Sequence, residues 1–280
     1  MDNELVSTDP YWIDQTSPLF VIQHQPVSGK INKTGVIILN SGFLHNVGPY
    51  RLSVDLADLI SSQGFVVARI DQSGKGESPT RLDAVGIDAK LLDFDETFDR
   101  LRADFGVSSC VLIGVCSGAD DALEIAELRE SVSGLVFLDG FSPVTLWYLA
   151  FHYYMRIRHF RAWLVWKKMI RDRKRRNLDI QNISTESTTI LSLRRWLSEN
   201  DVKSIYESIL KRGVKVLAIF SGGASDYYNH HGQLTRGLKA PTDSLHEVYF
   251  HEASHIYQIP EHREQLVMTI GKWMQDQFTG

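Results

Sequence analysis

The stretch Val111-Leu112-Ile113-Gly114-Val115-Cys116-Ser117-Gly118-Ala119 decides the fold of this chain. Its apolar run is typical of a buried strand, and it meets a tight Gly-x-Cys-x-Gly turn followed by a helix-forming sequence. Such a turn exposes its central side chain, and the flanking glycines let neighbouring backbone approach without a clash. The first N–H groups and the positive dipole end of the helix then face that side chain, which favours a thiolate and a developing oxyanion. Cys116 is therefore the candidate nucleophile.

Apolar, β-branched runs recur on both sides of this stretch, with helical segments between them. The runs lie at 36–39, 65–70, 110–113, 135–138, 216–220 and 245–250. Helical spacing of apolar residues occupies 52–60 and 87–105, and a final helix is expected at 261–278. This alternation predicts an α/β fold with a mostly parallel, doubly wound sheet, whose site lies at the carboxyl ends of the strands.

The alternation of strands and helices stops after Asp139-Gly140 and resumes near Gly213. We interpret residues 142–211 as an inserted helical cap, and residues 1–141 and 212–280 as the core domain. The first part of the cap is densely aromatic, and residues 141–180 hold ten Lys or Arg against two Asp, a local charge of +8. Because the whole chain has a net charge of -4, this basic segment is strongly segregated from an acidic remainder.

A thiol nucleophile needs a base to take its proton and an acid to orient that base. Both are expected at later strand ends. Asp226 follows the strand at 216–220, and His255 lies in the loop between the strand at 245–250 and the last helix. The alternatives are Asp139, which ends an earlier strand, and the histidines His246 and His251, which lie in or beside the last strand. We favour Asp226 and His255.

Several other motifs are weaker candidates for a functional site. Ser117 lies off the apex of the turn, so its backbone matters more than its hydroxyl. Gly74-Lys75-Gly76 lacks the spacing and the Lys-Ser/Thr ending of a phosphate-binding loop. His230-His231 near Asp226 has no further residues at metal-ligand spacing. Cys110 is interpreted as a small buried hydrophobe within its strand. We therefore expect no metal and no organic cofactor.

With the order nucleophile, acid, histidine, the chain resembles the α/β-hydrolase superfamily over nearly its whole length. The turn Asp71-Gln72-Ser73-Gly74-Lys75-Gly76-Glu77-Ser78 is similar to a turn common after the fourth strand of that family, and Asn40-Ser41-Gly42-Phe43 stands where the family has its oxyanion loop. The resemblance implies that backbone N–H groups of Gly42 or Phe43 and of Ser117 hold the oxyanion. It also implies that Asp226 and His255 complete the triad.

Cysteine in place of serine departs from the majority pattern of that superfamily. Members similar to dienelactone hydrolase show that a Cys-His-Asp arrangement can be catalytic, and the Gly-Val-Cys-Ser-Gly-Ala form resembles a bacterial subgroup that includes exosortase-associated hydrolases. The resemblance implies an ester or thioester hydrolase that works through an acyl-enzyme. Two alternatives stay open: an acyltransferase or cyclase with the same triad, and a noncatalytic binding protein on a hydrolase fold.

Composition limits the partners. A net charge of -4 and a pI near 6.2 argue against a nucleic-acid binder. The substrate is expected to be a small-molecule or carrier-bound acyl compound. Arg156 to Arg176 could contact anionic lipid at a membrane surface, a coenzyme A phosphate, or an acidic acyl-carrier helix. Two cysteines, a start without a signal peptide and no long apolar span favour a cytoplasmic location. The oligomeric state is left open.

Overall fold

The structure is a computed structural model that describes residues 6–13, 18–42, 44–143, 145, 147–151, 199–225, 227–238 and 243–279. The strands are β1 (Val6–Ile13), β2 (Leu19–Pro26), β3 (Thr34–Ile38), β4 (Val67–Asp71), β5 (Ser109–Val115), β6 (Val132–Leu138), β7 (Lys215–Ser221) and β8 (Leu245–Phe250). The α-helices are α1 (Leu52–Ser62), α2 (Ile87–Phe105), α3 (Ser117–Leu128), α6 (Glu199–Lys211), α7 (Gln233–Leu238) and α8 (Pro260–Phe278). Short 3-10 helices cover Pro49–Arg51 and Gly222–Ala224.

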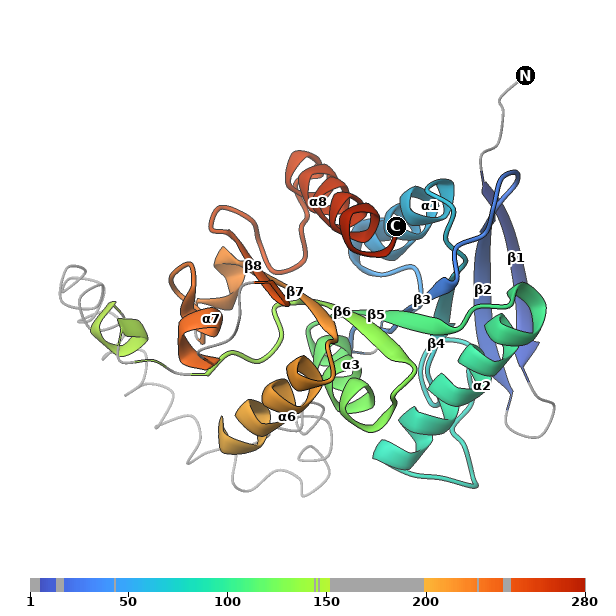
Figure 1. The fold of residues 1–280 in the computed structure, drawn as a ribbon, viewed down its shortest axis with the longest axis horizontal. Helices are drawn as coiled ribbons and strands as arrows, with labels where there is room; N and C mark the ends of the chain where they lie inside the picture. The colour runs from blue at the N-terminus through green and yellow to red at the C-terminus, as the bar shows by residue number, and fades with distance from the viewer. Residues whose placement is uncertain are drawn as a thin grey trace, which may run out of the picture.

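The described strands form one eight-stranded sheet in the order β1-β2-β4-β3-β5-β6-β7-β8 (Figure 1). β1 and β2 pair antiparallel, β2 pairs antiparallel with β4, and every later neighbour pair is parallel. The carboxyl ends of β3 and β5 to β8 therefore lie along the same edge, as the site requires. This is the α/β-hydrolase fold that the sequence predicts.

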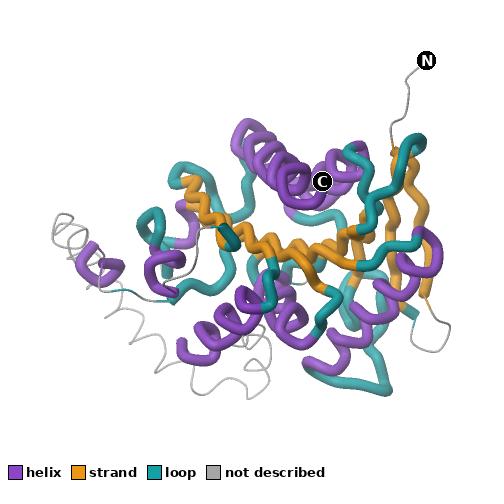
Figure 2. The backbone as a smooth tube through the Cα atoms, in the orientation of Figure 1, coloured by secondary structure: helices purple, strands orange, loops and turns teal. Residues whose placement is uncertain are grey.

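Helices cover both faces of the sheet, which gives three layers (Figure 2). α1 and α8 pack together on one face, over buried side chains that include Val36, Ile113 and Ile219. α2, α3 and α6 cover the other face, over side chains that include Leu112 and Phe137. Because β5 and β6 are covered on both faces, their apolar side chains do not alternate with polar ones, which explains their continuous apolar sequences.

All six strands expected from the sequence are present, and so are the helices at 52–60 and 87–105 and the last helix, which begins one residue earlier at Pro260. The sequence does not predict β1 and β2. Most of β1 is exposed and it carries Asp9 and Pro10, so the apolar pattern of a buried strand is missing there. Antiparallel pairing with β2 at the edge of the sheet forms this strand instead.

The predicted cap is described only at its two ends. Residues 152–198, including the basic segment from Arg156 to Arg176, lie outside the described residues. At the far end, α6 packs on α3, and its side chains Val202, Tyr206 and Ile209 belong to the hydrophobic core beneath the sheet. The described helices include none that is both long and apolar enough to cross a membrane.

Candidate active site

Cys116 lies at the junction of β5 and α3, in a strained backbone conformation with φ 55° and ψ −118°. Strain of this kind costs about 1–3 kcal/mol and persists only where the surroundings enforce it. Here the backbone N–H of Cys116 donates to the carbonyl of Leu138 in the next strand at 2.9 Å, and the Cys116 carbonyl accepts from Ala119 N at 3.0 Å. The side chain therefore stands at the apex of a sharp strand-to-helix turn, the geometry of a nucleophile elbow.

The two glycines of this turn are required by close backbone contacts. A Cβ atom on Gly114 would lie 2.1 Å from the carbonyl oxygen of Gly118, across the turn. A Cβ atom on Gly118 would lie 2.3 Å from the carbonyl oxygen of Asn40, at the end of β3. The Gly-x-Cys-x-Gly pattern therefore closes the turn and brings the start of α3 against the loop that follows β3.

His255 and Asp139 meet beside this turn. His255 Nδ1 is 2.7 Å from Asp139 Oδ2, and the imidazole also forms a hydrogen bond with the Cys116 side chain. Asp139 follows β6, the neighbour of β5, and its side chain is fully buried, whereas the side chain of His255 is 35% exposed. The contacts join Cys116, His255 and Asp139 in one chain of side chains, the arrangement of a nucleophile, a base and an orienting acid.

Asp139 is held by a second residue that sequence reasoning missed, Ser221 at the end of β7. The Ser221 N–H donates to Asp139 Oδ1 at 2.6 Å, and its hydroxyl donates to Oδ2 at 2.6 Å. The pairing of Leu138 with Ile219 brings the ends of β6 and β7 together, and this strand pairing, which the sequence does not give, places Ser221 beside Asp139. Asp226, the acid favoured from the sequence, lies outside the described residues, and the carboxylate that contacts His255 belongs to its alternative, Asp139.

The glycines after Ser221 let the loop that carries His255 approach closely. A Cβ atom on Gly222 would lie 2.0 Å from the carbonyl oxygen of His251, and one on Gly223 would lie 2.5 Å from the backbone nitrogen of His255. From the sequence, these small residues are expected to present Asp226 above the sheet. In the described structure, Gly222 and Gly223 instead leave space for the loop that carries His255, which passes over the end of β7.

The surroundings raise the pKa of His255 to about 10. The hydrogen bond to Asp139 is the largest cause, followed by the hydrogen bond to Cys116, while partial burial acts in the opposite direction. At neutral pH the imidazole is therefore charged and lies between the Asp139 carboxylate and the sulfur. This arrangement favours a thiolate–imidazolium pair before any substrate arrives.

We expect the contribution of His255 to the stability of the protein to fall as pH rises from about 6.5 to about 10. Between these values the folded protein holds a proton on His255 that the unfolded chain has lost, so higher pH favours unfolding; below about 6.5 the contribution is complete. The imidazole ¹⁵N resonances of His255 should titrate near pH 10, and at lower pH in Asp139→Asn. A wild-type ring that titrates near 6.5 would contradict this prediction.

The predicted oxyanion donors lie where the loop after β3 meets α3. Gly42 has φ 56°, and its N–H donates to the hydroxyl of Ser117 at 2.8 Å, so this N–H is already engaged. Ser117 is the first residue of α3, where backbone N–H groups have no partner within the helix and point toward the site. Phe43 lies outside the described residues. The hydroxyl of Ser117 thus contacts the loop after β3.

Asp71 anchors the same loop from the other side. Its fully buried carboxylate accepts from Asn40 Nδ2 at 2.7 Å, from Asn46 N at 2.7 Å, from Asn46 Nδ2 at 2.9 Å and from Glu77 N at 3.1 Å. Gly76 passes so close that a Cβ atom there would lie 2.3 Å from this carboxylate. The motif from Asp71 to Ser78 therefore supports the loop after β3.

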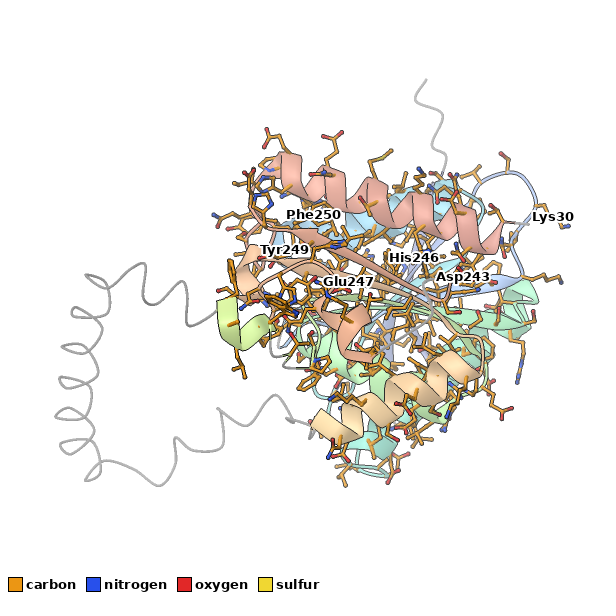
Figure 3. The ribbon with its side chains drawn as sticks, turned by 60° about the vertical axis from the view of Figure 1, so that its left-hand side comes forward. Lys30, Asp243, His246, Glu247, Tyr249 and Phe250 are labelled. Carbon is orange, nitrogen blue, oxygen red and sulfur yellow. The ribbon has the colours of Figure 1, made fainter. Side chains whose placement is uncertain are left out.

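The alternative histidines have other partners. Figure 3 shows β8 with His246, Glu247, Tyr249 and Phe250 labelled along it, between α8 and α7. His246 accepts a hydrogen bond from Trp273 of α8 at 3.0 Å, and His251 is largely exposed beside Glu252. Among the described residues, no group of three or more His, Cys, Asp or Glu side chains is placed to hold a metal ion.

Comparison with known proteins supports the family and the fold. Residues 31–194 match the family model Hydrolase_4, described as serine aminopeptidase, S33. Similar solved structures include an esterase from Pyrococcus furiosus, with TM-score 0.60 and 13% identity over 97% of this chain and 91% of that one. A dienelactone hydrolase from Anabaena variabilis has TM-score 0.57 and 13% identity over 97% and 98% of the two chains. A lidless α/β serine hydrolase from Xanthomonas campestris has TM-score 0.57 and 12% identity over 98% and 96%. No curated protein sequence matches the chain significantly.

Proposed function

Because the chain belongs to the Hydrolase_4 (serine aminopeptidase, S33) family, we propose that it hydrolyses a carboxylic ester or thioester through a covalent acyl-cysteine intermediate. The observation that carries the proposal is the hydrogen-bonded series of Cys116, His255 and Asp139 at the elbow after β5. Cysteine replaces the serine that the family description names. Since a thiolate attacks activated acyl groups readily, esters and thioesters are favoured over peptide bonds.

The reaction begins from the ion pair. The Cys116 thiolate attacks the carbonyl carbon, a C–S bond forms, and the oxyanion receives the N–H of Ser117 and a loop amide. When this intermediate collapses, the bond to the leaving group breaks and the leaving oxygen or sulfur takes the proton of His255. The now neutral His255 removes a proton from water, which attacks the thioester. Release of the carboxylic acid restores the thiolate and the imidazolium.

In this proposal Asp139 is the orienting acid. Asp139→Asn keeps the size of the side chain but removes the charge that stabilises the imidazolium, so we expect kcat to fall about 10³- to 10⁴-fold. Asp226→Asn is the matched control, because it makes the same change at the acid favoured from the sequence. We expect it to keep kcat within about threefold of wild type. The measurement is steady-state hydrolysis of one ester by all three proteins. The reverse pattern would assign the acid to Asp226.

A substrate panel tests the proposed activity. Aryl esters, acyl thioesters of increasing chain length and aminoacyl anilides are each incubated with the enzyme, and the released acid is quantified with and without an added amine or alcohol acceptor. The proposal predicts acid release from esters or thioesters. An acylated acceptor as the main product would make the protein an acyltransferase, and turnover confined to anilides would make it a peptidase.

The contact of the basic segment 156–176 with an acyl carrier or a membrane is a separate proposal. It is tested by replacing the Lys and Arg residues of this segment with neutral ones and measuring binding to each partner.

A further inference from the structure

The hydroxyl of Ser117 has a structural position that a nucleophile elbow does not itself require. Gly42 N donates to Ser117 Oγ at 2.8 Å, although the two residues are 75 positions apart in the chain. Ser117 is the first residue of α3 and directly follows Cys116, while Gly42 lies in the loop after β3. One hydrogen bond therefore connects the two segments that supply the backbone donors for the oxyanion.

The loop after β3 is held at both ends and also within itself, since Leu44 N donates to Ser41 O at 2.9 Å and Asn40 Nδ2 donates to Leu44 O at 2.9 Å. At one end, Gln72 N donates to Asn40 Oδ1 at 2.6 Å, and Asn40 donates to the Asp71 carboxylate. At the other end, Asn46 is held by Asp71 and by Arg69 Nη1, which donates to both Asn46 oxygens at 3.0 Å. Between these ends Gly42 takes a positive φ, and its N–H is directed at Ser117. Within this loop, the hydrogen bond from Gly42 N to Ser117 Oγ thus ties the middle of the loop to the first residue of α3.

We propose that Ser117 is a positioning residue whose hydroxyl holds the oxyanion loop in register with the N-terminus of α3. Its backbone N–H serves the oxyanion directly, and its side chain holds Gly42, and with it the loop after β3, against α3. The inference rests on the proposed function for its catalytic consequence, but not for the hydrogen bond itself. It also accounts for a small hydroxyl residue directly after the nucleophile, where the side chain must reach the backbone of another loop.

Three variants test this role. Ser117→Ala removes the hydroxyl, Ser117→Thr keeps it, and Ser41→Ala removes a neighbouring hydroxyl from the same loop as the matched control. The first readout is hydrogen exchange of the Gly42 amide by NMR, which needs no substrate. We expect exchange at least about tenfold faster in Ser117→Ala and nearly unchanged in the other two, because only the first loses the acceptor. Equal exchange in wild type and Ser117→Ala would overturn the proposal.

The second readout is turnover of an ester. Misplacing one oxyanion donor acts on the transition state, so we expect kcat of Ser117→Ala to fall about 10- to 100-fold while KM changes less than about threefold. Ser117→Thr keeps the hydroxyl and should recover most of the kcat that Ser117→Ala loses, whereas Ser41→Ala should stay near wild type. Faster exchange with unchanged kcat would show that the hydroxyl does not position the loop for catalysis. A wild-type protein without any turnover would instead reject the proposed function, and the exchange result alone would then decide whether Ser117 holds the loop.

Discussion

Replacing Cys116 by alanine is expected to lower kcat/KM for the best ester or thioester by at least about 10⁴-fold, the usual consequence of deleting a nucleophile. The sulfur is the atom to which the acyl group bonds, and it also stabilises the charge on His255. The variant should remain folded, because alanine is smaller and the strained backbone at this position is imposed by neighbouring contacts. Steady-state kinetics on purified wild type and variant, with urea unfolding of both, is the measurement.

Cys110→Ala is the control for this loss. Cys110 is the other cysteine of the chain, lies fully buried in β5, and has its pKa raised by burial, so it is not a reactive thiol. Its removal should lower stability by about 1 kcal/mol and leave kcat within about twofold. If the two variants lose activity equally, or if Cys116→Ala keeps more than about a tenth of it, Cys116 is not the nucleophile.

Gly118→Ala is expected to lower the free energy of unfolding by more than about 3 kcal/mol or to prevent soluble expression. The added methyl group would lie 2.3 Å from the carbonyl oxygen of Asn40, and neither backbone segment can move independently. Asn40 is fixed by Asp71 and Gln72, and Gly118 by the first turn of α3. Chemical denaturation of whatever protein is soluble measures the loss.

Gly35→Ala is a matched control in β3. A Cβ atom there would meet Leu101 at 3.4 Å, an ordinary contact, and the residue has no positive φ. We expect a change of less than about 1.5 kcal/mol. If Gly118→Ala were no more destabilising than this control, the close approach of α3 to the loop after β3 would be refuted. The steric reason for the second glycine of the Gly-x-Cys-x-Gly pattern would then be lost as well.

The fold followed largely from the sequence because the central strands β5, β6 and β7 are mostly apolar runs. The elbow followed from two glycines around Cys116, since such spacing serves few other purposes. His255 followed from its loop before the last helix. β1 could not be predicted, because an exposed edge strand is stabilised by pairing with β2 and not by its own apolar side chains.

The carboxylate that contacts His255 was harder to predict, because two strand ends offered an aspartate. Sequence alone does not give the strand order, which among the described residues brings Asp139 to the histidine. With β6 between β5 and β7, Asp139 lies one strand from Cys116, and its positive φ of 52° is a backbone conformation that aspartate tolerates. The contact of Ser221 with Asp139 could not be predicted for the same reason, since the two residues are 82 positions apart in the chain.

The most direct test of covalent catalysis by Cys116 is the intact mass of the protein, quenched in acid within the first turnovers with a slowly hydrolysed acyl thioester. We predict that wild type and Cys110→Ala gain the mass of one acyl group, that peptide mapping places it on Cys116, and that Cys116→Ala gains none. Acid release by wild type without any adduct, or an adduct of equal yield in Cys116→Ala, would contradict covalent catalysis by this cysteine.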